Sequence, residues 1–244
     1  MLVPVLKSKY FYIAIASVII GIGLNFASQT YLHNYMIEGK TLPMLSDMIL
    51  DHIPVIDLSL IYDFFSLIIL VVFVIYIMYR REHNRVPYFL VLWGIFYIVR
   101  GIFIVLTPFG NPPDFNGSDP LFNGFSKFEL GVYPSGHVGN AFMLLLLVND
   151  RIYKRIFAIC LVIITASLII AHSHYSIDIL SGFFFVYAIK AFGDRYLRMF
   201  EIGSTNHTGK KEREKSSPAP SVAFFESHDQ KIIDHADYRQ PQGK

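Results

Sequence analysis

Charged side chains are scarce in this sequence: they make up 16% of its 244 residues, whereas 53% are hydrophobic. A soluble domain of this length needs more charge to cover its surface, so an ordinary soluble protein is excluded. The net charge of only +2 does not indicate nucleic-acid binding. The single cysteine, Cys160, excludes a disulfide framework within one chain. Its place in an apolar block indicates a packing residue.

The hydrophobic residues form long blocks rather than one-sided helical stripes, which predicts helices surrounded by lipid. The predicted fold is all-α, with six transmembrane helices over residues 1–200 and a polar, disordered cytoplasmic tail over 201–244. The fourth block is short, because its apolar run of about 12 residues covers about 18 Å of a hydrocarbon core about 30 Å thick. Either this helix continues through Asn149 and Asp150, or its start at His137 lies below the membrane surface, or both. The predicted spans are Phe11–Ser28, Ile56–Tyr79, Val86–Thr107, His137–Val148, Ile152–Ala171 and His174–Phe192.

Basic residues are divided unevenly between the two ends of these spans. The loops at one end, about 29–55 and 108–136, contain only Lys40 and Lys127. The positive-inside rule therefore places both termini in the cytoplasm, which agrees with an even number of spans. The basic residues at the opposite end are Lys7, Lys9, Arg80, Arg81, Arg85, Arg151, Lys154, Arg155, Arg195 and Arg198.

Polar residues inside a membrane are costly, and the few present therefore suggest function. His174 and Asp178 are four residues apart, which predicts that they share one face of the sixth helix. The aspartate can accept a proton from one imidazole nitrogen and leave the other nitrogen unprotonated, as a nucleophile or base. A pair that only caps the helix is the structural alternative.

A second polar run, Pro134-Ser135-Gly136-His137, directly precedes the fourth helix. Backbone N–H groups at a helix start, beside a serine hydroxyl and a glycine, form an anion site. His137 can donate a proton to a leaving oxygen there. An ordinary turn with an N-cap is the alternative.

Arg100 is the third polar feature, and it lies in the outer half of the third span. A guanidinium at this depth needs an anionic partner, and we favour a phosphate over snorkelling to the interface. Spans three, four and six carry these features near the same end, so we expect them to converge on one site.

The three motifs resemble the signatures of the type 2 phosphatidic acid phosphatase superfamily. Pro134-Ser135-Gly136-His137 is similar to the second signature, and His174-x-x-x-Asp178 to the end of the third. The first signature has lysine, six residues, arginine and proline, where this chain has Arg100 and Thr107-Pro108. The third opens with Ser-Arg, where this chain has Ser167-Leu168. Two phosphate-binding arginines are thus replaced, which disfavours simple phosphomonoester hydrolysis.

Within that superfamily the chain resembles the sphingomyelin synthase family over about residues 40–190. The run Ala171-His172-Ser173-His174-Tyr175-Ser176-Ile177-Asp178 is similar to that family's Ala-His-Asp-His-Tyr-Thr-x-Asp. Leu42-Pro43 with Asp51-His52-Ile53-Pro54, and the run from Arg100 through Pro112-Pro113, are also similar. Pro134 departs from the family, which usually has phenylalanine before Ser-Gly-His.

The resemblance implies a membrane enzyme that moves a phospho-head-group from a phospholipid to ceramide or a related lipid. His174 would attack phosphorus, Asp178 would orient it, and His137 would protonate the departing oxygen. Arg100, Ser135 and Gly136 would stabilise the phosphoryl oxygens. The reaction implies no metal and no cofactor, and the His172-x-His174 pair lacks a carboxylate ligand set. The alternatives are a lipid-phosphate or isoprenyl-pyrophosphate phosphatase, and a non-catalytic membrane protein that retained the scaffold.

Overall fold

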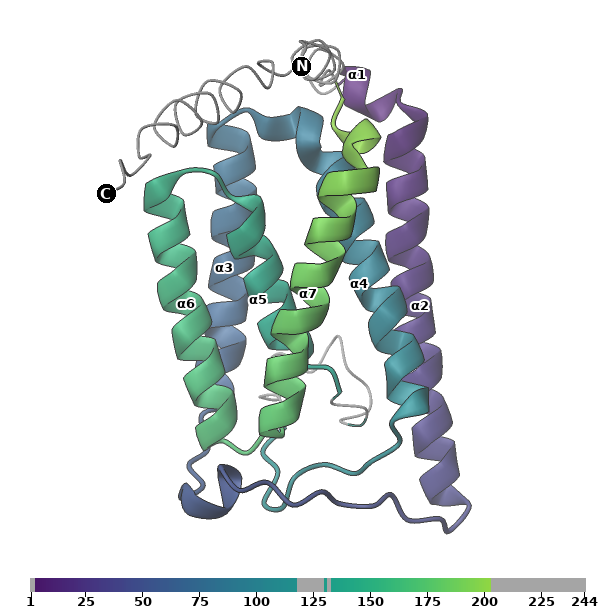
Figure 1. The fold of residues 1–244 in the computed structure, drawn as a ribbon, viewed down its shortest axis with the longest axis vertical. Coiled ribbons are helices and arrows are strands. Elements are labelled where there is room, and N and C mark those ends of the chain that lie inside the picture. The colour runs from purple at the N-terminus through teal and green to yellow at the C-terminus, as the bar shows by residue number, and fades with distance from the viewer. Residues whose placement is uncertain (1–2, 118–129, 131–132, 203–244) are drawn as a thin grey trace, which may run out of the picture. The chain divides into compact units, whose positions relative to one another are not determined.

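The computed structural model describes residues 3–117, 130 and 133–202, and within these ranges the regular structure is helical, with no strand. Residues 203–244 of the predicted tail and the part of the 108–136 loop that contains Lys127 lie outside the described residues. A short helix, α1 (Val3–Leu6), precedes six main helices. These are α2 (Lys9–Ile37), α3 (Ser59–Tyr79), α4 (Val86–Leu106), α5 (Gly136–Leu147), α6 (Arg151–Ile170) and α7 (Ser176–Tyr196) (Figure 1).

Five of the main helices, α2, α3, α4, α6 and α7, are long and apolar enough to cross a membrane. Their outward side chains are large and apolar: Ile19 on α2, Ile75 on α3 and Phe184 on α7 are each more than half exposed. Such a surface is unfavourable in water and favourable in lipid. The prediction of an all-helical, multi-pass integral membrane protein is therefore confirmed.

The short helix α5 has the 12 residues that its apolar run predicted. It does not continue through Asn149 and Asp150, so that alternative is wrong. Asp150 instead begins the next helix, because its Oδ1 accepts hydrogen bonds from the N–H groups of Ile152 (2.8 Å) and Tyr153 (3.3 Å). Figure 1 shows that α5 starts part way along α6 and α7.

Helix packing places α5 at the centre. It contacts α3, α4, α6 and α7, while α2 lies along α4 and α3 lies along α6. The close contact of α2 with α4 uses small residues: a Cβ added at Gly94 would lie 2.2 Å from Ser17 Oγ. Polar bonds reinforce it, because Ser28 Oγ donates to the Gly101 carbonyl at 2.7 Å. A site at the start of α5 can therefore collect residues from most of the other helices.

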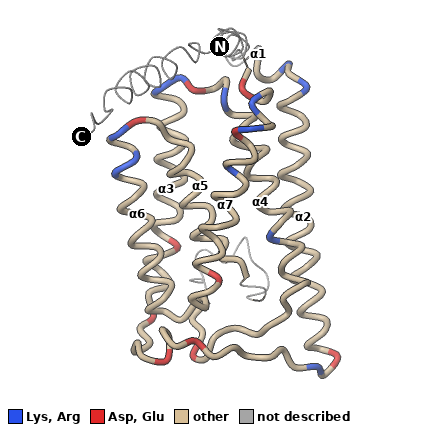
Figure 2. Tube along the Cα trace, viewed as in Figure 1, with Lys and Arg blue, Asp and Glu red and all other residues tan. Residues whose placement is uncertain are grey.

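Charges separate toward the two ends of the helices, as Figure 2 shows. The end that holds η2 (Glu82–Arg85), the start of α6 and the end of α7 carries most of the Lys and Arg residues, and we call it the basic end. The opposite end, formed by residues 38–58, 107–117 and 171–175, is called the site end. Among the described residues of these three segments, Lys40 is the only Lys or Arg, and the carboxylates are Glu38, Asp47, Asp51, Asp57 and Asp114.

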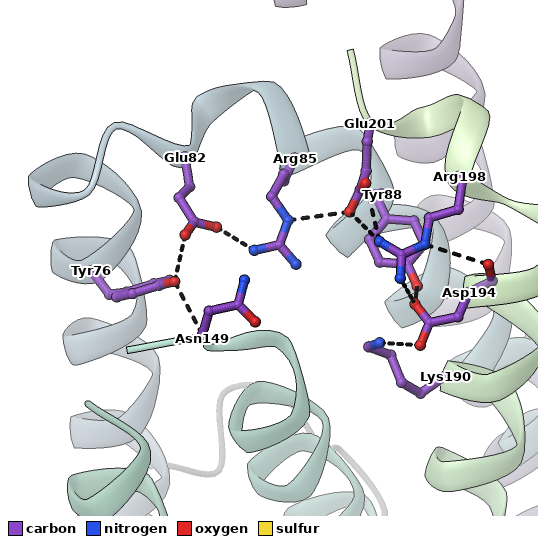
Figure 3. Close-up of polar contacts among 9 residues, drawn as sticks. All are labelled: Tyr76, Glu82, Arg85, Tyr88, Asn149, Lys190, Asp194, Arg198 and Glu201. Carbon is purple, nitrogen blue, oxygen red and sulfur yellow. Dashed lines mark hydrogen bonds and ion pairs between the residues drawn. The ribbon is translucent and has the colours of Figure 1, made fainter. Parts of the chain in front are cut away.

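A connected network of charged side chains joins three elements at the basic end (Figure 3). Arg85 of η2 pairs with Glu82 and, at 3.2 Å, with Glu201. Arg198, in η4 (Arg198–Phe200), pairs with Glu201 at 3.2 Å and with Asp194 of α7 at 2.7 Å. The segment that follows α7 is therefore held against the turn between α3 and α4. The other residues drawn in Figure 3 are Tyr76, Tyr88, Asn149 and Lys190.

Candidate active site

The starts of α5 and α7 lie against each other. The backbone N–H of Ser135, the N-cap of α5, donates to the carbonyl of Asp178 in the first turn of α7 at 3.0 Å. Gly182 permits this approach, since a Cβ there would lie 3.2 Å from the Ser135 carbonyl oxygen. The two histidine motifs, which are distant in the sequence, therefore meet inside the bundle.

His174 is held by a loop, not by a helix. The sixth helix begins at Ser176 rather than at His174, so the prediction that His174 and Asp178 share one helix face is wrong. The chain reverses after α6 at His172, whose φ of 52° is left-handed. His174 then approaches Asp178 from outside the helix, with Nδ1 3.4 Å from Oδ2, which is long for a hydrogen bond.

Asp178 serves both the helix and the imidazole. Its Oδ2 accepts the backbone N–H of Tyr175 at 2.9 Å, which caps the start of α7, and the same oxygen faces His174. Asp178 is fully buried, and its Oδ1 has no hydrogen-bond partner among the described residues. The capping alternative is therefore part of the observed structure, but it does not exclude the predicted pairing.

Burial lowers the pKa of the loop residue His174 below its ordinary value, and the hydrogen bond to Asp178 opposes this only in part. The imidazole is therefore neutral at pH 7. Because Nδ1 faces a carboxylate, we assign the proton to Nδ1, which leaves Nε2 with a lone pair. Among the described residues Nε2 has no hydrogen-bond partner. This nitrogen has the properties of a nucleophile or base.

His137, the second residue of α5, is paired with a residue that the sequence analysis missed. Its Nε2 lies 3.2 Å from Oδ1 of Asp63 on α3, and its ring meets the ring of Tyr62 edge-on at 5.2 Å. The centroids of the His137 and His174 rings are 6.2 Å apart. Asp63 is buried, and the signal that could have found it is a carboxylate well inside the apolar second span. Two imidazole–carboxylate pairs thus lie together.

The start of α5 provides backbone donors for an anion. Ser135 accepts the N–H of Val138 through its side chain at 3.4 Å, whereas the N–H groups of Gly136 and His137 have no acceptor in the described part of the chain. These orphan donors and the helix dipole favour a negatively charged ligand. Ser135 itself is fully buried and is positioned to shape this turn.

Arg100 lies directly beside this helix start. Its Nε donates to the Pro134 carbonyl at 3.0 Å, and its Nη1 donates to Asn25 Oδ1 at 2.6 Å. A Cβ on Gly136 would lie 3.3 Å from Nε, so glycine allows the guanidinium to approach the α5 start closely. Both of these partners are neutral oxygens, and the anionic ligand expected for Arg100 stays a prediction. Asn25, a buried polar residue of α2, was also missed by the sequence analysis.

The loops at the site end hold the His174 segment on several sides. His172 Nε2 is 3.1 Å from the carbonyl of Ile53, so His172 is engaged with the first loop. Ser173 Oγ donates to the carbonyl of Asn116 at 2.5 Å, and Asn116 Nδ2 donates to the carbonyl of Ala171 at 3.1 Å. The 171–175 turn is thus fixed by tertiary bonds to two other loops.

The two positions at which phosphatases of the resembled superfamily carry arginine are occupied by uncharged, structural side chains. Thr107 Oγ1 donates to the carbonyl of Phe103 at 2.5 Å, one turn back in its own helix. Leu168 is fully buried in the hydrophobic core. Neither residue can supply a positive charge to a phosphate.

Comparisons with known proteins give no family for this chain: no protein-family model matches it, and no curated protein sequence matches it. What the site can do is therefore inferred from the residues and their geometry. The structure brings together His174, Asp178, His137, Arg100, Ser135 and Gly136, and it adds Asp63 and Asn25 to them.

Proposed function

We propose that this protein is a membrane lipid head-group phosphotransferase. It moves a phospho-head-group, such as phosphocholine, from a glycerophospholipid to ceramide or a related lipid alcohol. One observation carries the proposal: the His174–Asp178 and His137–Asp63 pairs lie with their imidazole centroids 6.2 Å apart, beside the start of α5 and Arg100. This arrangement combines a nucleophile, an acid–base group and an anion site.

In the first half of the reaction, Nε2 of His174 attacks the phosphorus of the donor lipid. A P–N bond forms, and the P–O bond to diacylglycerol breaks. His137 gives its proton to the departing oxygen, and the head group remains on His174 as a phosphohistidine. Because Asp63 faces Nε2 of His137, we assign the transferred proton to Nδ1.

In the second half, the hydroxyl of the acceptor lipid attacks the same phosphorus. His137 takes the hydroxyl proton, the P–N bond breaks, and Nε2 of His174 recovers its lone pair. Arg100, the Ser135 turn and the Gly136 amide stabilise the charged phosphoryl oxygens in both halves. Asp178 keeps His174 oriented throughout, and the balance of atoms needs no further reactant.

Two considerations favour transfer from a phosphodiester. The sequence resembles the sphingomyelin synthase family, most specifically over residues 171–178. In addition, a phosphomonoester carries a charge of about −2 at neutral pH, whereas a phosphodiester is a monoanion. Among the described residues, Arg100 supplies the guanidinium of this site. Thr107 and Leu168, at the positions where the phosphatases carry arginine, are uncharged. A single guanidinium matches the phosphodiester monoanion better than the phosphomonoester dianion.

A lipid-phosphate or isoprenyl-pyrophosphate phosphatase is the second candidate. Pro134, before Ser-Gly-His, is the form that the phosphatase superfamily carries. In that reaction water would replace the lipid alcohol in the second half, and the same phosphohistidine would be hydrolysed. The two candidates therefore differ in the acceptor and not in the nucleophile.

The proposed orientation puts both termini in the cytoplasm and the site end in the lumen or outside the cell. The distribution of Lys and Arg in Figure 2 supports this, because basic residues are retained on the cytoplasmic side. The enzyme would then act on lipids of the non-cytoplasmic leaflet.

The test is to supply fluorescent ceramide and phosphatidylcholine to membranes that contain the full chain. We expect a new fluorescent phosphosphingolipid with an equal amount of diacylglycerol. His174→Ala should abolish it, while the control His52→Ala, an exposed histidine of the first loop, should not.

Release of inorganic phosphate from a lipid phosphate, without transfer to ceramide, would establish the phosphatase instead. If neither product forms from any supplied lipid, the non-catalytic alternative gains and the proposal is rejected. Equal turnover by His174→Ala and the wild type would remove His174 as nucleophile.

A further inference from the structure

We propose that Asp47, in the loop between α2 and α3, is a positioning residue that holds the start of α7 and thereby His174 in place for transfer. This inference rests on the proposed function for its kinetic part. Asp47 lies outside the three sequence motifs, and its contact with α7 joins residues that are 129 positions apart.

The Asp47 carboxylate binds the first residue of α7 twice. Its Oδ2 accepts the backbone N–H of Ser176 at 2.6 Å, and its Oδ1 accepts the Ser176 hydroxyl at 3.0 Å. The Ser176 N–H is one of the helix-start donors that have no partner within the helix. A carboxylate at this position is favoured by both the hydrogen bond and the helix dipole.

The same carboxylate is fixed within its own loop. Oδ1 also accepts the backbone N–H groups of Ile49 (2.9 Å) and Leu50 (3.3 Å). Burial alone would raise the pKa of Asp47, but the hydrogen bonds from Ser176, Ile49 and Leu50 lower it below its ordinary value. Asp47 is therefore ionised at neutral pH, and it ties residues 47–50 to the start of α7.

The residue between His174 and Ser176 is anchored by the same loop. The hydroxyl of Tyr175 accepts the backbone N–H of Leu45 at 3.1 Å and donates to the carbonyl of Asn111 at 3.1 Å. Tyr175 is almost fully buried. Both residues that follow His174 are thus held by residues 45–47, so displacement of this loop would change the distance between Nδ1 of His174 and Asp178.

Asp47 also separates the two helix starts electrostatically. The start of α7 is occupied by the carboxylates of Asp47 and Asp178, whereas the N–H groups of Gly136 and His137 at the start of α5 have no acceptor among the described residues. An anionic phosphoryl group is repelled from the first and attracted to the second. Asp47 therefore directs the phosphoryl group toward α5 and leaves His174 to approach it from the α7 side.

The experiment compares Asp47→Asn with Asp51→Asn, which removes an exposed carboxylate from the same loop. Hydrogen–deuterium exchange of the full chain in lipid nanodiscs should show the Ser176 amide exchanging at least about tenfold faster in Asp47→Asn. The kcat for head-group transfer should fall about tenfold, with KM changed less than about twofold. Asp51→Asn should match the wild type in both measurements. A loss of folding would instead lower the yield of folded protein, and it would reduce exchange protection throughout the chain rather than only at α7.

Ser176→Ala gives a second, milder test, because it removes only the hydroxyl bond. We expect a loss in kcat of about twofold to threefold. If Asp47→Asn does not fold, wild-type kcat and wild-type Ser176 exchange in Ser176→Ala would overturn the inference. Unchanged Ser176 exchange in Asp47→Asn would overturn the inference, and so would faster exchange with wild-type kcat. A wild type that transfers nothing would overturn the proposed function, while the exchange comparison would still decide whether Asp47 holds α7.

Discussion

Nε2 of His137 and Oδ1 of Asp63 lie 3.2 Å apart, although the two residues are 74 positions apart in the sequence. The contact joins the start of α5 to α3, and Asp63 is buried. Burying an ionised carboxylate in a membrane-spanning helix costs free energy unless the carboxylate is paired. The contact with His137 therefore both stabilises Asp63 and positions the imidazole. It fixes one nitrogen of His137 and thereby the orientation of the imidazole that the proposed acid step uses.

Asp63→Asn should therefore lower kcat about 100-fold, because the amide no longer fixes the orientation and the tautomer of the His137 imidazole as the carboxylate does. Asparagine has nearly the same shape, so the melting temperature should stay close to that of the wild type. The measurement is transfer kinetics across pH together with thermal unfolding. Wild-type kcat in this variant would show that Asp63 has no part in catalysis.

Gly136→Ala should weaken phosphoryl binding. The added methyl would lie 3.3 Å from Nε of Arg100, so the guanidinium must move by a few tenths of an ångström. We expect kcat/KM to fall about tenfold, since small displacements of an anion-binding group are costly to the transition state. Gly23→Ala is the matched control, because a Cβ at Gly23 meets no atom within 4 Å. Equal kinetics for both variants would contradict the role of Arg100.

Glu201→Gln should reduce stability without a specific effect on turnover. Glu201 forms ion pairs with both Arg85 and Arg198 at the basic end, and its side chain is only 10% exposed. We expect a loss of about 1–2 kcal/mol, between the values typical of exposed and buried pairs. Thermal unfolding in detergent measures it. Glu38→Gln is the control: its pair with Lys40 is more than half exposed, so it should change little.

Labelling of introduced cysteines tests the proposed orientation. Met48→Cys places a thiol at the site end, and Met199→Cys places one at the basic end; both positions are well exposed. In intact cells that carry the protein in the plasma membrane, a membrane-impermeant maleimide should label Met48→Cys. Met199→Cys should react only after permeabilisation, and the wild type, whose Cys160 is buried, should react in neither case. The reverse pattern would invert the topology.

The helices were predictable because each is encoded by a continuous apolar segment of the sequence. Long apolar blocks identified the spans, and the 12-residue run correctly indicated that α5 is short. The start of α7 was placed two residues early, since the i, i+4 spacing of His174 and Asp178 fits a helix. Tertiary bonds decided otherwise: Asp47 caps Ser176, and the Ser173 hydroxyl is bound to Asn116.

The partners of the site were predictable only where a motif contained them. Asp63, Asn25 and Asp47 act on residues that are 74, 75 and 129 positions away, and no local pattern encodes such pairings. Asp63 and Asn25 could have been noticed as polar residues in apolar spans, although their partners could not. Asp47 lies in the loop between the first two predicted spans, where a carboxylate is ordinary and does not by itself indicate a function.

The most direct test of the central claim is to find the covalent intermediate. Protein in nanodiscs is incubated with phosphatidylcholine labelled in the head group, without an acceptor lipid, quenched in alkali and analysed by peptide mass spectrometry. We expect labelled phosphocholine on His174 in the wild type, none in His174→Ala, and loss of the label when ceramide is added. Transfer to ceramide without any label on His174, or with a label on another residue, would contradict the account.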